Sequence, residues 1–167
     1  MRVAKWYRRT KQQPSEHETI AYLAAPLLRA LGWTPQKMAI EWKFVDIALF
    51  DSMPRSEENL AVVVEAKTLG SSSLMAWDQG VAYCAKTTRT RCSRMVVTDG
   101  IAYAVYLKPP EGSFSRTPSG YLNLTRMMET YPILGCRGAT AALEMMAPDW
   151  NSAPEPTLPA DKEIEDL

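Results

Sequence analysis

The stretch "VVVEAKT", Val62–Thr68, decides how the rest of the sequence is interpreted. Its three valines are typical of a buried strand, yet Glu65 and Lys67 follow two positions apart. Alternate residues of a strand point to the same face, so we expect these two charged side chains to lie side by side. Burying such a pair for stability alone is unfavourable, because the desolvation cost can exceed the attraction between the charges. The stretch therefore predicts both a strand and a functional site.

The composition indicates one globular domain in a reducing compartment. A chain of 167 residues is long enough to close a hydrophobic core. No apolar run approaches the roughly 20 residues of a membrane helix, and no apolar segment follows the basic start as it would in a secretory signal. The three cysteines are odd in number and form no CxxC, which fits free thiols. We expect a cytoplasmic protein with no membrane partner.

The net charge of zero hides an uneven distribution. Residues 149–167 are acidic and Pro-rich, which predicts a disordered tail or linker, and the remaining chain has a net charge of +5. Two basic clusters lie in that remainder: Arg2, Lys5, Arg8, Arg9 and Lys11, interleaved with Trp6 and Tyr7, and then Lys86, Arg89, Arg91 and Arg94. Such clusters suit a phosphate backbone, but they also suit a solvated surface and a disordered arm. We treat residues 1–14 as a basic N-terminal arm and residues 15–148 as the domain.

Several kinds of chemistry are excluded by what the sequence lacks. His17 is the single histidine, and the cysteines lack zinc-ligand spacing, so a zinc site of Cys and His ligands is not expected. Neither GxxxxGK[ST] nor GxGxxG occurs, which argues against nucleotide-driven chemistry. Carboxylates, lysines and a hard metal ion remain as candidates for catalysis.

The periodicity of the sequence predicts an α/β domain. Ser15 and Glu18 form a capping box that begins a helix, Gly32 ends it, and Pro26 is expected to kink it. The other expected elements are a strand over 38–50, a strand over 60–68, a helix over 71–89, a hairpin over 94–107 turned at Asp99-Gly100, a short strand at 121–124 and a short helix over 138–146. A central mixed β-sheet with helices on its faces buries these surfaces most economically.

Asp46 is the one carboxylate in the apolar middle of the strand predicted over 38–50, where Phe44 and Ala48 are expected on its face. If the strands containing Asp46 and Glu65 pair as a hairpin, Asp46 lies beside Glu65 and Lys67. Two carboxylates would suit a hard divalent cation such as Mg²⁺, which activates water and neutralises charge at a phosphate. Lys67 would orient that water or stabilise the transition state. The alternative is a salt-bridged pair at a frayed strand end, and the additional aspartate favours the site.

These residues resemble a known family. "VD" followed after 18 residues by "EAK" is similar to the PD-(D/E)XK nuclease motif. The blocks "SEHETIAYLAAPLLRALGW", "VDIALF", "VVVEAKTLG", "DQGVAYC" and "VVTDGIAYAVY" resemble, in that order, the N-terminal nuclease domain of type I restriction-enzyme restriction subunits. The resemblance implies a restriction-endonuclease-like, three-layer α/β/α fold. It also implies a Mg²⁺- or Mn²⁺-dependent DNA endonuclease that acts in restriction, defence or DNA processing.

The resemblance also assigns roles to residues. Asp46, Glu65 and the Ala66 carbonyl would hold the metal ion, and Lys67 would be the catalytic lysine. Gln79 and Tyr83 match a QxxxY motif that supports the active site or contacts DNA, and Lys86, Arg89 and Arg91 follow as further candidate DNA contacts.

Many of these nucleases also use a glutamate from the first helix. Glu18 is explained by the capping box, whereas Glu16 falls on the core-facing stripe of the helix, so Glu16 is preferred as the catalytic, metal-binding residue.

The partners implied are DNA and, because restriction subunits carry translocase domains after the nuclease, a translocase, methyltransferase or specificity subunit. The sequence is expected to be either a small stand-alone protein or a domain of a longer one. Cleavage of both strands by one active site usually needs two copies, which predicts a homodimer or a transient pair. Two other functions fit the same residues. One is a non-catalytic nucleic-acid-binding or assembly module that acts through a larger partner, and the other is an RNA-directed nuclease of the same fold.

Overall fold

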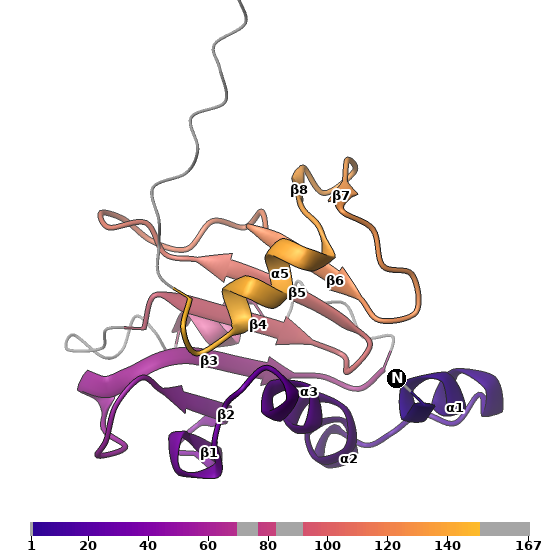
Figure 1. The fold of residues 1–167 in the computed structure, drawn as a ribbon, viewed down its shortest axis with the longest axis horizontal. Helices are drawn as coiled ribbons and strands as arrows, with labels where there is room; N and C mark the ends of the chain where they lie inside the picture. Colours follow the sequence, from indigo (N-terminus) through magenta and orange to yellow (C-terminus); the bar gives the residue numbers. More distant parts are fainter. Residues whose placement is uncertain (1, 70–76, 83–91, 151–167) are drawn as a thin grey trace, which may run out of the picture.

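The computed structural model describes residues 2–69, 77–82 and 92–150, and within these ranges the chain forms an α/β fold around an eight-stranded mixed sheet (Figure 1). The order across the sheet is β1-β2-β3-β4-β5-β6-β8-β7. The strands are β1 Met38–Trp42, β2 Val45–Phe50, β3 Leu60–Ala66, β4 Arg94–Thr98, β5 Ala102–Leu107, β6 Gly120–Asn123, β7 Thr130–Tyr131 and β8 Cys136–Arg137. The helices are α1 Arg2–Thr10, α2 Glu16–Thr19, a π-helical turn Ile20–Ala24, α3 Ala25–Ala30 and α5 Ala139–Met146, with short 3-10 turns at Pro35–Lys37 and Glu57–Asn59 and helical residues at 77–82. The predicted α/β class is thus confirmed.

The sheet is antiparallel except at two places. β3 and β4 are parallel, and the connection between them includes the helical residues 77–82; β6 and β8 are also parallel. The predicted hairpin turn at Asp99-Gly100 joins β4 to β5. Gly100 has a φ of +84°, and Asp99 Oδ1 accepts hydrogen bonds from the amides of Ile101 and Ala102. These two features explain why Asp-Gly stands at this turn.

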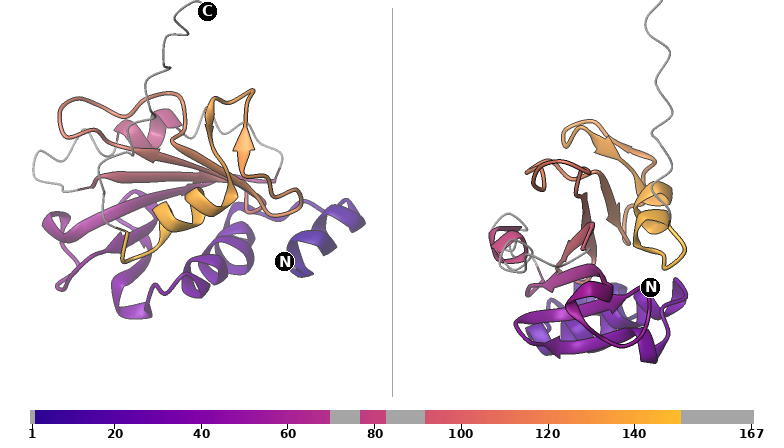
Figure 2. Two further views of the ribbon diagram at one scale, coloured as in Figure 1. Left: turned by 45° about the horizontal axis from the view of Figure 1, so that its top comes forward. Right: turned by 90° about the vertical axis from the view of Figure 1, so that its left-hand side faces the viewer.

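Helices cover both faces of the sheet (Figure 2). On one face, the helical segment 16–30 and α5 pack over a core that includes Ile47, Leu49, Val62, Val64, Val96 and Leu122. On the other face, Trp77 and Val81 of the 77–82 helix pack with Phe114 over a core that includes Ala48, Val63, Met95, Val97 and Tyr106. Since successive residues of a strand point to opposite faces, the valine-rich run of β3 supplies both cores at once.

The helical segment 16–30, which comprises α2, the π-helical turn and α3, begins as the sequence predicts. Ser15 Oγ accepts from the Glu18 amide at 3.2 Å, and Glu18 Oε2 accepts from the Ser15 amide at 2.8 Å. The kink expected at Pro26 takes the form of a π-helical turn just before it, in which the Ala25 amide donates to the carbonyl of Ile20. A wider turn gives room for the proline ring, which has no amide hydrogen and would crowd the carbonyl four residues earlier.

The prediction of one strand over 38–50 was wrong, because this segment is a hairpin. β1 and β2 pair antiparallel from Met38↔Leu49 to Trp42↔Val45. The φ values are positive at Glu41 (+52°), inside β1, and at Lys43 (+56°), in the turn. Such values are uncommon outside glycine and asparagine and leave little sequence signal. Phe44 lies in this turn with 91% of its surface exposed, so it does not share a strand face with Asp46 as expected.

Segments beyond both expected domain limits also pack on the domain. The basic arm forms α1, whose Ala4 and Tyr7 are buried against Leu23 and Ile101. Trp150 packs on the core beyond the expected domain limit at 148, while residues 151–167 of the expected tail lie outside the described residues. In the described ranges, no helix is both long and apolar enough to span a membrane.

Candidate active site

Asp46 and Glu65 meet where the pairing of β2 with β3 ends. Ile47↔Val64 is the last paired position, so Asp46 and Glu65 come next along the two antiparallel strands. Asp46 Oδ2 accepts a hydrogen bond of 2.7 Å from the Ala66 amide. The expectation that hairpin pairing brings Asp46 beside Glu65 is therefore confirmed.

The Ala66 peptide has a defined orientation at this strand end. The next amide, that of Lys67, donates to the Thr98 carbonyl at 2.8 Å on the β4 side. Because amides alternate in direction along a strand, the Ala66 amide and carbonyl both face β2. The Asp46 carboxylate thus takes the place of a backbone acceptor, and the Ala66 carbonyl faces the same side as that carboxylate.

Lys67 and Glu16 connect the strand end to the first helix. Lys67 Nζ lies 3.2 Å from Glu16 Oε1, and both side chains are partly shielded from solvent. Glu18, two residues further along the same helix, forms the capping box with Ser15. Of the two glutamates between which the sequence left a choice, Glu16 is the one that contacts the predicted catalytic lysine.

The two strand carboxyls sit in an environment that disfavours their ionised forms. Glu65 is only 5% exposed. Burial first, and then the negative charges of Asp46 and Glu16, raise the pKa of Glu65 to about 7, against the lowering effect of Lys67. Burial is also the main cause that raises the pKa of Asp46, although the Ala66 amide and Lys67 act in the opposite direction. The cluster carries more negative charge than Lys67 alone offsets.

This donor set suits a hard divalent cation, though not through three side chains at once. Within residues 2–69, 77–82 and 92–150, no three His, Cys, Asp or Glu side chains lie close enough together to hold a metal ion. Glu16 instead pairs with Lys67. The groups that fit a cation are the carboxylates of Asp46 and Glu65 and the Ala66 carbonyl, all hard oxygen donors; Mg²⁺ typically takes one or two carboxylates and keeps several waters.

Gly80 is a site feature that the sequence reasoning missed. A Cβ on Gly80 would lie 2.4 Å from Met95 Sδ and 3.4 Å from Glu65 Cγ, so the 77–82 helix approaches Glu65 closely at this glycine. Its only sequence signal is a glycine inside a predicted helix, where glycine is less stable than alanine by about 1 kcal/mol and so suggests a packing reason. Glycine here lets the helix shield Glu65 from solvent.

The remaining predicted site residues are placed only in part. Gln79 precedes Gly80 on the 77–82 helix and is exposed. Tyr83, Lys86, Arg89 and Arg91 lie outside the described residues. The paired role of Gln79 and Tyr83 stays a prediction.

No protein-family model, curated protein or solved structure matches this chain.

Proposed function

We propose that this chain is a Mg²⁺-dependent DNA endonuclease with a restriction-endonuclease-like fold of the PD-(D/E)XK type. The observation that carries the proposal is the meeting of two shielded carboxylates, Asp46 and Glu65, with Lys67 at the end of β3. A structural ion pair would have one carboxylate for each cation, whereas this strand end has an excess of negative charge. A hard cation would offset that excess.

The residues of the site divide the work as follows. Asp46, Glu65 and the Ala66 carbonyl would hold Mg²⁺, which supplies charge neutralisation at a scissile phosphate and a lowered pKa for a bound water. The Ala66 amide fixes the orientation of the Asp46 carboxylate through its 2.7 Å hydrogen bond. Because this bond leaves the second oxygen of Asp46 for other partners, the carboxylate can be held and remain a donor to a cation.

Lys67 supplies the positive charge next to the reacting phosphate. Glu16 accepts a hydrogen bond from Lys67 Nζ at 3.2 Å and so limits the directions in which the ammonium group can point. An ammonium has two further hydrogens, one for an attacking water and one for a phosphate oxygen. Glu16 thus acts as a positioning residue, and Lys67 stabilises the charge that develops in the transition state.

A DNA substrate agrees with the charge of the molecule, since the chain without residues 149–167 is basic. A non-catalytic nucleic-acid-binding module would share that charge. It would have no use for Asp46 and Glu65 placed side by side in a shielded position, where burial and the charge of Asp46 raise the pKa of Glu65 at a cost to stability.

Nicking of supercoiled plasmid tests the proposal. The purified chain is incubated with Mg²⁺, Mn²⁺ or EDTA, alongside Lys67→Ala and, as a matched control, Lys108→Ala in the exposed loop after β5. We expect metal-dependent nicking that falls about 10²- to 10³-fold in Lys67→Ala and is unchanged in Lys108→Ala. DNA binding without cleavage under any metal condition would contradict the proposal and favour the non-catalytic binding module. Cleavage of RNA in preference to DNA would favour the RNA-directed nuclease.

A further inference from the structure

Helix α1 carries a concentrated positive charge beside the candidate active site. The segment from Arg2 to Lys11 has five basic residues and no acidic one. Arg2, Lys5 and Arg9 are exposed. A solvated helix of a globular protein usually mixes both signs of charge, which stabilises it through pairs one turn apart. α1 has no acidic residue to form such pairs, so its positive charge is available to a partner outside the helix.

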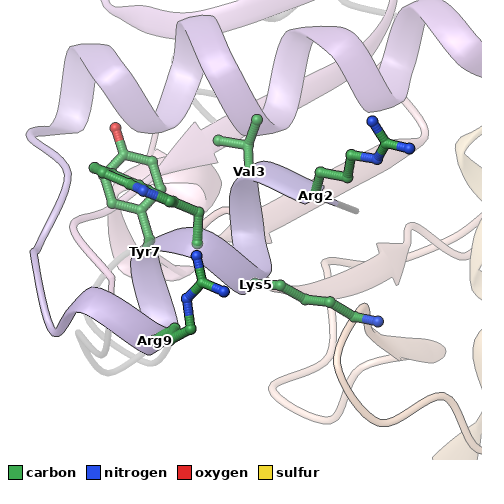
Figure 3. Close-up of a pocket in the computed structure, with 6 residues that line it drawn as sticks. Arg2, Val3, Lys5, Tyr7 and Arg9 are labelled. Atoms are coloured by element: carbon green, nitrogen blue, oxygen red, sulfur yellow. The ribbon is translucent and has the colours of Figure 1, made fainter.

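A surface hollow lies along the same helix. A hollow of about 690 Å³ is lined by Arg2, Val3, Lys5, Trp6, Tyr7 and Arg9. Figure 3 shows Arg2 and Lys5 extending to the same side of α1, with Arg9 turned back along the helix. Trp6 is 42% exposed, although its ring meets the Tyr7 ring edge-on at a centroid distance of 4.9 Å. The three cations and the exposed Trp6 ring thus line one hollow.

α1 is held next to the strand end that bears the candidate active site. Ala4 and Tyr7 form a buried cluster with Leu23 and Ile101, and Leu69 packs against it. Leu69 is two residues beyond Lys67 in the chain. Figure 1 shows α1 at the end of the molecule toward which β3 runs.

We propose that the α1 surface, defined as Arg2, Lys5, Trp6 and Arg9, binds an unpaired stretch of the substrate strand next to the cleavage site. This inference rests on the proposed nuclease function. The three cations neutralise backbone phosphates, and the exposed ring of Trp6 stacks on one base. Stacking on an aromatic ring requires a base that is free of its partner strand, and cations bordering an aromatic platform are the usual means of binding single strands. The substrate class is therefore DNA with a single-stranded segment, such as an overhang or a fork.

A basic helix with aromatic residues can also bind an anionic membrane surface, but the exposed apolar side chains of α1 are only Val3 and Trp6 among the side chains that the structure describes there. Membrane binding by such a helix depends on burying its apolar side in the lipid. The apolar side of α1, Ala4 and Tyr7, is already buried against the protein. Nucleic acid requires only the exposed cations and the Trp6 ring.

Fluorescence anisotropy in EDTA tests the inference without any contribution from cleavage. The full chain is titrated onto a labelled oligothymidylate of about 15 nucleotides, within the range of one binding groove, and onto a duplex of equal length. Arg2→Gln/Lys5→Gln/Arg9→Gln is compared with Arg29→Gln/Lys108→Gln/Arg126→Gln, which removes the same charge from exposed positions elsewhere. Trp6→Leu tests stacking.

We expect the wild type to prefer the single strand. The α1 triple variant should lose at least about tenfold in affinity and reduce the slope of log K against log salt by about 2, the value for three phosphate contacts on a single strand, while the control triple changes little. Trp6→Leu should lose about tenfold on the single strand and nothing on the duplex. Equal losses in the two triple variants, an unchanged Trp6→Leu, or binding to phosphatidylserine vesicles without binding to the oligonucleotide would each overturn the inference.

The test separates this inference from the proposed function. Lys67→Ala should bind the oligonucleotide as the wild type does, because Lys67 is not part of the α1 surface. A chain that binds in this α1-dependent way but never cleaves would retain the inference as a binding property and contradict the nuclease proposal. If the α1 variants cleave and bind DNA as the wild type does, the nuclease proposal is retained and the inference about the α1 surface is contradicted.

Discussion

Replacing Glu65 by glutamine should make the metal-free protein more stable above pH 7, although Glu65 is proposed to be essential for activity. Glutamine has nearly the size of glutamate, so the close contact of this side chain with Gly80 is kept. What changes is the charge. The pKa of Glu65 is raised to about 7 in the folded chain from an ordinary value of 4.5. The folded state therefore holds the proton more tightly than the unfolded state does.

The sign and size of the effect follow from that difference. Below pH 4.5 the carboxyl is protonated in both states and costs nothing. As the pH rises from 4.5 to about 7, the unfolded chain releases its proton first, so the free energy of unfolding falls. Each pH unit in this window corresponds to about 1.4 kcal/mol, which gives a cost of about 3 kcal/mol once Glu65 is fully ionised. Glu65→Gln avoids this cost.

Urea denaturation in EDTA, followed by circular dichroism at pH 5 and pH 8, measures the effect. We expect the wild type to lose stability between the two pH values and Glu65→Gln to lose clearly less, ending about 2 to 3 kcal/mol more stable at pH 8. Glu144→Gln, on an exposed position of α5, removes the same charge and should follow the wild type. A Glu65→Gln variant that is less stable than the wild type at pH 8 would refute the electrostatic reasoning.

Three further substitutions test the fold around the site by the same denaturation assay. Ser15→Ala should cost about 1 kcal/mol, because it removes the side-chain cap of the helix that carries Glu16; no loss would mean that the cap is replaced by solvent. Arg94→Met should cost about 3 kcal/mol, since the buried guanidinium donates to two carbonyls at the end of α5 at 2.9 and 2.7 Å, which would lose their partner; a neutral result would show that water reaches them. Gly100→Ala should cost more than about 1 kcal/mol, because its φ is +84° and a Cβ would lie 2.4 Å from Leu23 Cδ1; an unchanged stability would mean that the turn has another conformation.

The sequence predicted the placement of Asp46 beside Glu65 better than it predicted the strands around them. The side-by-side placement of Asp46 and Glu65 followed from period-2 alternation and hairpin pairing, and these depend only on local backbone geometry. The choice of Glu16 over Glu18 followed from a capping box that is itself a local motif. Each inference required a few neighbouring residues and no knowledge of the tertiary packing.

The features that the sequence missed depend on contacts between distant segments. The end of β1 and the turn after it have positive φ values at Glu41 and Lys43 without glycine, so the hairpin of β1 and β2 was predicted as one strand. Among the side chains of α1 that the structure describes, only Ala4 and Tyr7 are buried, and their partners Leu23 and Ile101 lie far along the chain. β7 and β8 have two residues each and are too short to give a periodic signal.

Calorimetric titration of Mg²⁺ or Mn²⁺ into the metal-free protein tests most directly the claim that Asp46 and Glu65 form a cation site. The titration is made at pH 7 in two buffers with different ionisation enthalpies, with Asp46→Asn and the exposed control Asp149→Asn alongside. We predict binding at one site with release of about half a proton, because Glu65 has a pKa of about 7 and must ionise to bind the metal. Binding should be lost in Asp46→Asn and kept in Asp149→Asn. An absence of binding at millimolar metal, or binding that Asp46→Asn leaves intact, would contradict the account.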